Sequence, residues 1–254
     1  MSEAGADDTI DPGRRLIRVD LSAAQSLTQR FAHYFERLTW RTPIHDRRLA
    51  GRHPLKLLVV PGDPLSHDPA RSETLADGML SAFGEARDVI GFDWTLPTAG
   101  RLFADHVHSF EWLRDLSVLG RRDQVAPVAE TMMAGWLAVH ADRVSQQAWR
   151  PDLWGRRLMM WTAHAPLILS STDLVYRSKV LNTIARGARH LDRTADRTPP
   201  GPQRIAAWCG VVAAGLLLPN GEARRAVGEA GLARALSTSL SADGGVVTRS
   251  PVDL

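Results

Sequence analysis

The chain has 254 residues, of which 44% are hydrophobic and 23% charged, as in an ordinary folded globular protein, so composition excludes general disorder. The formal net charge is +3, and the positive residues are almost all arginines interleaved with acids, which favours solvated helix faces over a nucleic-acid-binding run. A single cysteine, Cys209, lies in an apolar stretch and excludes both an internal disulfide and a cysteine-based zinc site.

The first part of the chain predicts a tail followed by a helix. Residues 1–20 are polar, and the start has no basic and apolar pattern of a secretory signal, so we expect a cytoplasmic protein. Residues 21–40 predict the first helix, with Ser22 as its N-cap and one apolar face. That face consists of Leu27, Phe31, Tyr34, Phe35 and Leu38. We expect Thr42-Pro43 to end this helix.

The rest of the leader, which we extend to residue 98, contains short apolar runs between turn signals. Residues 54–61 enclose five consecutive or near-consecutive aliphatic side chains between two prolines and are compatible with a short strand. Glycines divide residues 78–96 into short segments, which predicts a small β-hairpin or an irregular appendage. The leader therefore differs in character from the helical region that follows.

From residue 99 to 254 the pattern is that of successive helices joined by short turns. The predicted helices cover residues 101–119, 125–141, 152–169, 173–194, 203–218 and 222–240, and Pro166 is expected to break or kink the third. Helix 203–218 is apolar on nearly every side, so we expect it between two helical layers; it is too short to span a bilayer comfortably. The fold class is mainly α, an incomplete α/α toroid of antiparallel helical hairpins with a small β-hairpin appendage near the N-terminus.

Four segments in this order resemble heparinase II/III-like proteins, and the resemblance runs over about residues 45–254. The segments are HSFEWLRDL at residues 108–116, WRPDLWGRRL at 149–158, WTAH at 161–164, and DGG at 243–245 followed by RSP at 249–251. The leader segment PLKL at 54–57 also fits the family. The resemblance implies an α/α toroid that in family members precedes a larger β-sandwich, and a lyase that cleaves uronic-acid polysaccharides by β-elimination.

The same resemblance implies that the catalytic site is incomplete in this chain. The family's catalytic His is expected in the β-sandwich, which lies beyond Leu254. Lyases of the family usually have a Tyr within or just after the DGG…SP segment, and no Tyr is present there. The Asn-His pair that neutralises the uronate carboxylate also has no counterpart around residues 199–204. Catalytic residues therefore stay unassigned, and no cofactor or metal is expected.

The candidate substrate-binding residues are Arg157, Trp161, His164, Arg249, His108 and Trp112. Arg157, Trp161 and His164 share one helix face at positions i, i+4 and i+7, where a Trp can stack on a sugar ring while Arg and His contact carboxylates. The alternative interpretation is a packed Trp with a hydrogen-bonded His and a paired Arg. His108 and Trp112 have the same two interpretations, substrate contact or helix packing.

Other polar residues form no recognised site. His106 and His108 form an HxH, but a helical turn directs them to different faces, which disfavours zinc. Asp63, His67 and Asp68 lie in a turn-rich loop without a nucleophile-elbow serine. Gly-rich phosphate-binding loops are missing, and Gly228 and Gly231 are interpreted as close-packing positions in a helix.

We therefore expect the toroid portion of a heparinase II/III-like polysaccharide lyase that is an incomplete catalyst by itself. The expected partner is an acidic polysaccharide or oligosaccharide. A β-sandwich domain on another chain is a further candidate partner, and so is a second copy of this chain. Nucleic acid and a membrane span are not expected. The alternative function is a noncatalytic helical scaffold that binds a glycan or a protein.

Overall fold

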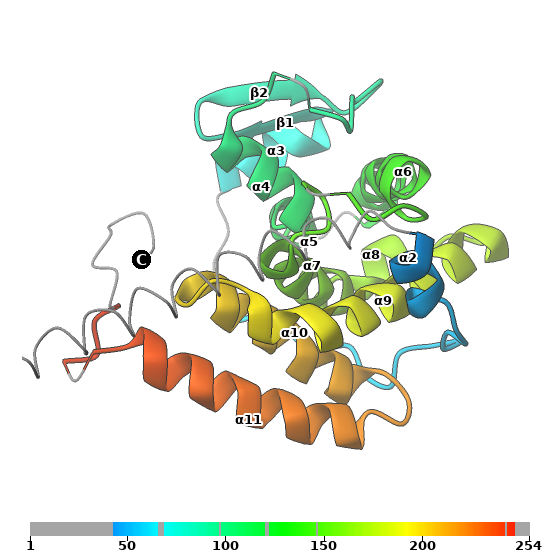
Figure 1. Cartoon of the computed structure of the whole chain (residues 1–254). Coiled ribbons are helices and arrows are strands. Elements are labelled where there is room, and N and C mark those ends of the chain that lie inside the picture. The colour runs from blue at the N-terminus through cyan, green and yellow to red at the C-terminus, as the bar shows by residue number, and fades with distance from the viewer. Residues whose placement is uncertain are drawn as a thin grey trace, which may run out of the picture. The chain divides into compact units, whose positions relative to one another are not determined.

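The computed structural model describes residues 43–65, 69–96, 98–119, 122–145, 147–241 and 243–246. The described part is mainly helical with one small two-stranded antiparallel sheet (Figure 1), as the sequence predicts. The described residues from 43 onward belong to one compact unit, so the described part of the leader packs within the same unit as the later helices. The helix predicted over residues 21–40 lies outside the described residues.

The elements follow one another in this order along the chain. The first half contains α2 (Pro43–Leu49), α3 (Pro69–Ala76), β1 (Met79–Ala82), β2 (Glu85–Asp88), α4 (Arg101–Ser109), α5 (Trp112–Ser117) and α6 (Arg122–His140). The second half contains α7 (Pro151–Ala163), α8 (Ala165–Ile168), α9 (Leu174–Thr194), the 3₁₀ turn η1 (Ala195–Arg197), α10 (Pro202–Leu217) and α11 (Glu222–Ser239).

The leader departs from the sequence prediction in two places. Helices α2 and α3, which were not predicted, each begin at a proline, a residue that the first helical position tolerates because its N–H would be unsatisfied there anyway. Residues 54–61 form no strand, so that prediction is wrong. Their aliphatic side chains are largely solvent-exposed, with Leu55 at 88%, and the hydrophobic run therefore does not mark a buried strand.

The predicted hairpin is confirmed as β1 and β2, paired antiparallel from Met79 opposite Asp88 to Ala82 opposite Glu85. The two residues between the strands, Phe83 and Gly84, have φ of 52° and 78°. Positive φ at both positions is the requirement of the tight turn that matches the twist of a two-stranded hairpin. The hairpin lies over α3 and α4 (Figure 1).

The single helix predicted over residues 101–119 is two helices. Phe110 ends α4 in the left-handed region, with φ 63° and ψ 23°, and its side chain is fully buried. A non-glycine residue in this region is uncommon. Apolar periodicity continues across the break into α5, and the sequence pattern therefore does not reveal it.

The later helices agree closely with the prediction. Helix α9 begins after Asp173, whose carboxylate accepts hydrogen bonds from the N–H groups of Val175 and Tyr176. The expected break before Pro166 is also present, because α7 ends at Ala163 and the short α8 starts at Ala165. Pro166 thus ends one helix and is accommodated in the first turn of the next.

Helix α10 lies between α7 and α11, as its apolar character predicts (Figure 1). Gly155 of α7 meets the backbone of α10 so closely that a Cβ there would lie within 3.0 Å of the carbonyl group of Ala206. On the other side of α10, Gly231 of α11 lies against the ring of Trp208, and Gly228 lies against Val211 and Val212. Glycines therefore permit close packing on both sides of α10, and the packing role predicted for Gly228 and Gly231 is confirmed.

Helices α10 and α11 are antiparallel, because residues late in α10 approach residues early in α11. Gly215 lies against Arg225, whereas Trp208 lies against Gly231. Residues 218–221 make the short connection, in which Asn220 adopts a φ of 56°. Within the described ranges, no helix combines the length and the apolar character that crossing a membrane requires.

Candidate functional site

Two of the predicted site residues, Arg157 and Trp161, meet in a buried aromatic cluster. Helix α7 contributes Trp154, Arg157 and Trp161 at helical spacing, so that all three point to the same side. Phe110 from the α4–α5 junction and Trp136 from α6 complete the cluster. The Trp161 ring lies 5.1 Å from that of Phe110 and 5.3 Å from that of Trp136, both in edge-to-face arrangements.

The Arg157 guanidinium lies at the centre of this cluster and is fully buried. Its Cζ atom is 4.3 Å from the Trp136 ring centroid and 4.6 Å from that of Trp154, within the range of cation–π attraction. Nε donates to the His108 carbonyl at 2.7 Å, and Nη2 donates to the Ala148 carbonyl at 2.8 Å. Burial lowers the pKa of Arg157 well below its usual value, with the charge of Asp152 opposing the shift.

This geometry supports packing over substrate contact for four predicted residues. Arg157, Trp161, His108 and Trp112 each have an exposed fraction of 0%. The Trp112 indole N–H donates to the Val107 carbonyl at 3.2 Å, which holds α5 against the end of α4. All four side chains are closed to solvent in this conformation, which fits the packing interpretation, and substrate contact at these positions stays an untested prediction.

His108 is a neutral core histidine. Its Nδ1 accepts a hydrogen bond from the Trp136 indole N–H at 3.3 Å, so its proton is on Nε2. The ring packs edge-to-face on His140 at 5.2 Å. Burial, with the charge of Arg157 as a second cause, lowers the pKa of His108 to about 2. A group with such a pKa stays uncharged at neutral pH and cannot bind an anion as a cation.

His164 belongs to a different group, in which it meets Asp63 and Arg114. Asp63 Oδ2 accepts from Arg114 Nε at 2.7 Å and lies 3.2 Å from His164 Nε2. The side chains of His164 and Asp63 are 6% and 9% exposed, and that of Arg114 is 17% exposed. The group joins the leader to α5 and to the end of α7, since Asp63 precedes Arg114 by 51 residues and His164 by 101 residues in the sequence.

The charges in this group are well defined. Burial alone would raise the pKa of Asp63, but hydrogen bonds from Arg114 and from the Leu65 N–H hold it below its ordinary value. Burial lowers the pKa of His164, although Asp63 opposes that shift. Asp63 is therefore an ionised carboxylate neutralised by Arg114, and it orients a neutral imidazole. An Asp–His pair of this kind could position a proton acceptor, but the Arg114 ion pair makes it primarily a structural anchor.

The remaining candidates do not assemble a site in the described residues. Arg249, His67 and Asp68 lie outside the described ranges. His106 lies 3.7 Å from Glu111, and in the described chain no three residues of the metal-binding types come together. Cys209 is a free thiol whose pKa is raised by burial, which disfavours a nucleophilic role.

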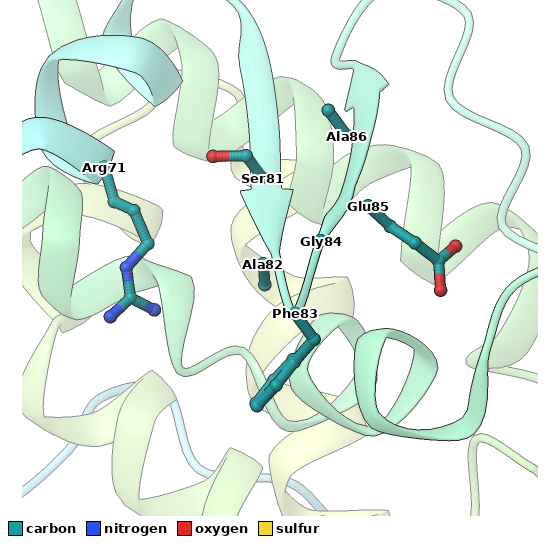
Figure 2. A pocket seen from close by; sticks show the side chains of 7 residues that line it. All are labelled: Arg71, Ser81, Ala82, Phe83, Gly84, Glu85 and Ala86. Atoms are coloured by element: carbon teal, nitrogen blue, oxygen red, sulfur yellow. The ribbon is translucent and has the colours of Figure 1, made fainter.

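A hollow of about 480 Å³ lies beside the β-hairpin and is shown in Figure 2. Arg71 of α3 and the hairpin turn at Phe83 line it, and Glu85 points away from Arg71. Glu85 is already engaged by the Gly100 N–H at 2.9 Å and by Arg87 at 3.1 Å. The one carboxylate that lines this hollow is therefore already paired.

One polar network that the sequence did not reveal holds the start of α7. Arg150 donates to Asp105 of α4 at 2.7 Å and to both carboxylate oxygens of Asp152. Although burial opposes the shift, these two carboxylates raise the pKa of Arg150 above its usual value. The WRPD segment that carries the family resemblance thus contributes a helix-anchoring ion network, together with the Trp149 ring 4.8 Å from that of Trp154.

Comparison with known proteins gives one informative similarity. No family model matches the chain, and no solved structure matches it. The chain is 27% identical over 222 residues to FtsZ-localized protein C of Caulobacter vibrioides (strain NA1000 / CB15N). The matched region covers 87% of this chain and 38% of that protein, so the chain spans well under half the length of this relative.

Proposed function

We propose that the described helices form a noncatalytic binding module that works where FtsZ assembles. The similarity to FtsZ-localized protein C carries this proposal, because it runs through 87% of the chain and not through a short motif. The proposal corresponds to the scaffold alternative that the sequence leaves open. It assigns to the module a role in contacting other proteins, while any chemistry belongs elsewhere.

The burial of reactive and stacking groups supports a binding role over catalysis. All tryptophans among the described residues are at most 5% exposed. They are Trp94, Trp112, Trp136, Trp149, Trp154, Trp161 and Trp208. The described Tyr176 hydroxyl is also buried, and burial raises the pKa of this group above its usual value. No described Trp is therefore available to stack on a sugar, and Tyr176 is unsuited to deliver a proton.

Direct binding and localisation test this proposal. The purified 254-residue chain should bind immobilised FtsZ from the same organism, and a fluorescent fusion should overlap with FtsZ in cells. Immobilised serum albumin controls for nonspecific adsorption, and circular dichroism confirms that the fusion is folded. A folded, full-length fusion that spreads evenly through the cell, together with no binding to immobilised FtsZ, would contradict the proposal.

A second proposal is the toroid portion of a heparinase II/III-like lyase acting on a uronic-acid polysaccharide. The antiparallel α10–α11 hairpin packed on α7 supports it, since successive hairpins are what a toroid needs. The Asp63–Arg114–His164 group supports it as well, because in the described residues it places His164, whose side chain is 6% exposed, beside the cationic Arg114, which is 17% exposed.

A separate measurement, of uronate binding and cleavage, tests this second proposal. The chain alone should bind a uronate oligosaccharide in calorimetry without producing the ultraviolet absorbance of an unsaturated uronate. Replacement of His164 by Ala should weaken that binding, whereas Arg101→Ala, on the exposed face of α4, should leave it unchanged. Robust elimination by the isolated chain would show that the catalytic site is complete, and absence of any uronate binding would remove the second proposal.

A further inference from the structure

Helices α2 and α9 bring together arginines that are dispersed in the sequence. On α9, Arg186, Arg189 and Arg193 are spaced by three and four residues and therefore share one face over about 10 Å of helix. Arg48 at the end of α2 and Arg52 in the following loop lie against this face. We call these five residues, Arg48, Arg52, Arg186, Arg189 and Arg193, the arginine surface.

Backbone contacts fix the arrangement of this surface. Arg189 Nε donates to the Leu49 carbonyl at 2.6 Å, and its Nη1 donates to the Arg52 carbonyl at 3.2 Å. The Arg193 guanidinium lies 3.5 Å from the Arg48 carbonyl. Because these bonds use carbonyls, they position the guanidiniums without neutralising them.

Few carboxylates balance the charge of the arginine surface. Arg186 lies 3.5 Å from Asp46, and Asp192 is taken by Arg224 of α11 through a two-pronged contact at 2.9 and 3.0 Å. Across the ranges that the structure describes, no carboxylate lies within ion-pair distance of Arg48, Arg52 or Arg193. These three side chains are exposed, so their charges are open to a ligand.

The arginines of this surface act on one another electrostatically. Burial lowers the pKa of Arg189, and the charges of Arg186, Arg224 and Arg193 lower it further. Burial also lowers the pKa of His45 on α2, where Asp46 opposes the shift and Arg193 and Arg48 add to it. The Nη2 of Arg189 is buried and has no hydrogen-bond partner in the described residues. Like charges three and four residues apart destabilise a helix, and a bound anion would relieve that repulsion.

The side chains around the arginines favour a carboxylate-bearing peptide. A planar guanidinium binds a carboxylate through two parallel hydrogen bonds, and arginine is the preferred residue for such pairs. Single-stranded nucleic acid is bound by basic grooves with stacking aromatics, and none of the exposed large side chains on α2 or the second half of α9 is aromatic. The same described part of these two helices also exposes no large aliphatic side chain, whereas the loop after Arg52 exposes the aliphatic run at residues 55–60, so anionic vesicles are a necessary competitor in the test.

We propose that the arginine surface binds an acidic segment of a partner protein, in which Asp or Glu side chains pair with Arg48, Arg52 and Arg193. An extended segment presents every second side chain on one face, about 7 Å apart, so carboxylates two positions apart in the segment can pair with different arginines of this surface. This inference comes from the charges of the chain and does not depend on the role with FtsZ.

Fluorescence anisotropy with a labelled ten-residue peptide of alternating Glu and Ser tests it. The full chain should bind this peptide, binding should weaken as salt is raised, and a Gln–Ser peptide should not bind. The triple variant Arg48→Glu, Arg52→Glu and Arg193→Glu should weaken binding about tenfold or more. Arg101→Glu, a charge reversal on α4 at a side chain that is 77% exposed, is the matched control and should change the affinity less than about twofold.

Three results would overturn the proposal. The first is equal affinity of the triple variant and the control variant for the acidic peptide, with both shown to be folded by thermal unfolding. The second is binding of anionic vesicles, or of a single-stranded oligonucleotide, that competes the acidic peptide away and depends on the same three arginines. The third is no binding of the acidic peptide at low salt.

Discussion

Gly155→Ala tests the packing of α7 on α10, which organises the second half of the domain. The added methyl group would fall within 3.0 Å of the Ala206 carbonyl group and reach the Ala207 Cα, where unstrained carbon contacts need about 3.5–4.0 Å. Both are backbone atoms of α10, so no side-chain rotation can relieve the overlap, and the two helices must separate. Gly210 of α10 is part of the same contact, because a Cβ at that position would lie 2.5 Å from the Gly155 Cα.

The magnitude follows from two opposing effects. Overpacking a close contact destabilises by about 1–3 kcal/mol, and a backbone clash belongs at or above the upper end of that range. Replacing a mid-helix glycine by alanine returns about 1 kcal/mol through helix propensity. We therefore expect a net loss of about 2–3 kcal/mol in the free energy of unfolding, which corresponds to a Tm lowered by roughly 5–10 °C in a domain of this size.

Thermal unfolding monitored by circular dichroism gives the Tm, and urea unfolding gives the free energy of unfolding. The matched control is Gly62→Ala, because a Cβ at Gly62 meets nothing within 4 Å and should change stability by less than about 0.5 kcal/mol. If Gly155→Ala and Gly62→Ala unfold at the same temperature, the close approach of α7 and α10 is not present in solution.

The remaining predictions concern buried charge and buried histidine. Burial lowers the pKa of His108 to about 2 and that of His190 to about 3, both below the ordinary value of about 6.5, so only the unfolded chain takes up these protons as the pH falls below that value. The free energy of unfolding, measured with urea, should therefore decrease by about 1.4 kcal/mol per histidine between pH 7.5 and 5.5. His190→Gln should reduce this pH dependence, and a variant with the same pH dependence as the parent would contradict the prediction. Arg157→Ala should lower the free energy of unfolding by about 3–5 kcal/mol, because it opens a cavity and leaves two carbonyls unpaired. Arg157→Met, which fills more of that space, should lower it less. Equal stability of Arg157→Ala and the parent would refute the buried arrangement. Asp63→Asn should lower the free energy of unfolding by about 1–3 kcal/mol at pH 7. Because the pKa of Asp63 is lowered in the folded chain, its ionised carboxylate stabilises the fold above the ordinary carboxyl pKa, and this stabilisation disappears as the pH falls below about 4. Urea unfolding at pH 7 and pH 3 should therefore show a smaller difference between variant and parent at pH 3.

Local signals made the helices from α6 to α11 predictable. Asp173 is a capping residue before an amphipathic stretch, and the structure uses it in that way at the start of α9. Pro166 is a helix breaker, and α7 ends just before it. Such elements are set by the chemistry of neighbouring residues, which the sequence displays directly.

The arrangement of the candidate site was not accessible in the same way. Periodicity placed Arg157, Trp161 and His164 on one helix face, and Arg157 and Trp161 do lie together, whereas His164 follows the last helical residue of α7. Which partner meets that face is a tertiary matter: Trp136 and Phe110 cover the first two, whereas Asp63 reaches the third. The same limitation explains why arginines that look scattered along the chain gather where α2 meets α9.

The left-handed turn at Phe110 was hidden for another reason. Its buried ring packs against the rings of Trp94, Trp112, Trp136 and Trp161. A large buried side chain stabilises a backbone conformation that phenylalanine rarely adopts, and no local residue type announces this. Burial, which emerges only in the folded chain, therefore decides the conformation.

The glycine contacts on both sides of α10 have a consequence for how this domain can move. Helices locked at backbone distance on two faces cannot slide past one another by small rotamer adjustments, so α7, α10 and α11 should respond to a bound partner as one solid piece. Their amide hydrogens would then exchange with solvent mainly through cooperative opening of the whole assembly.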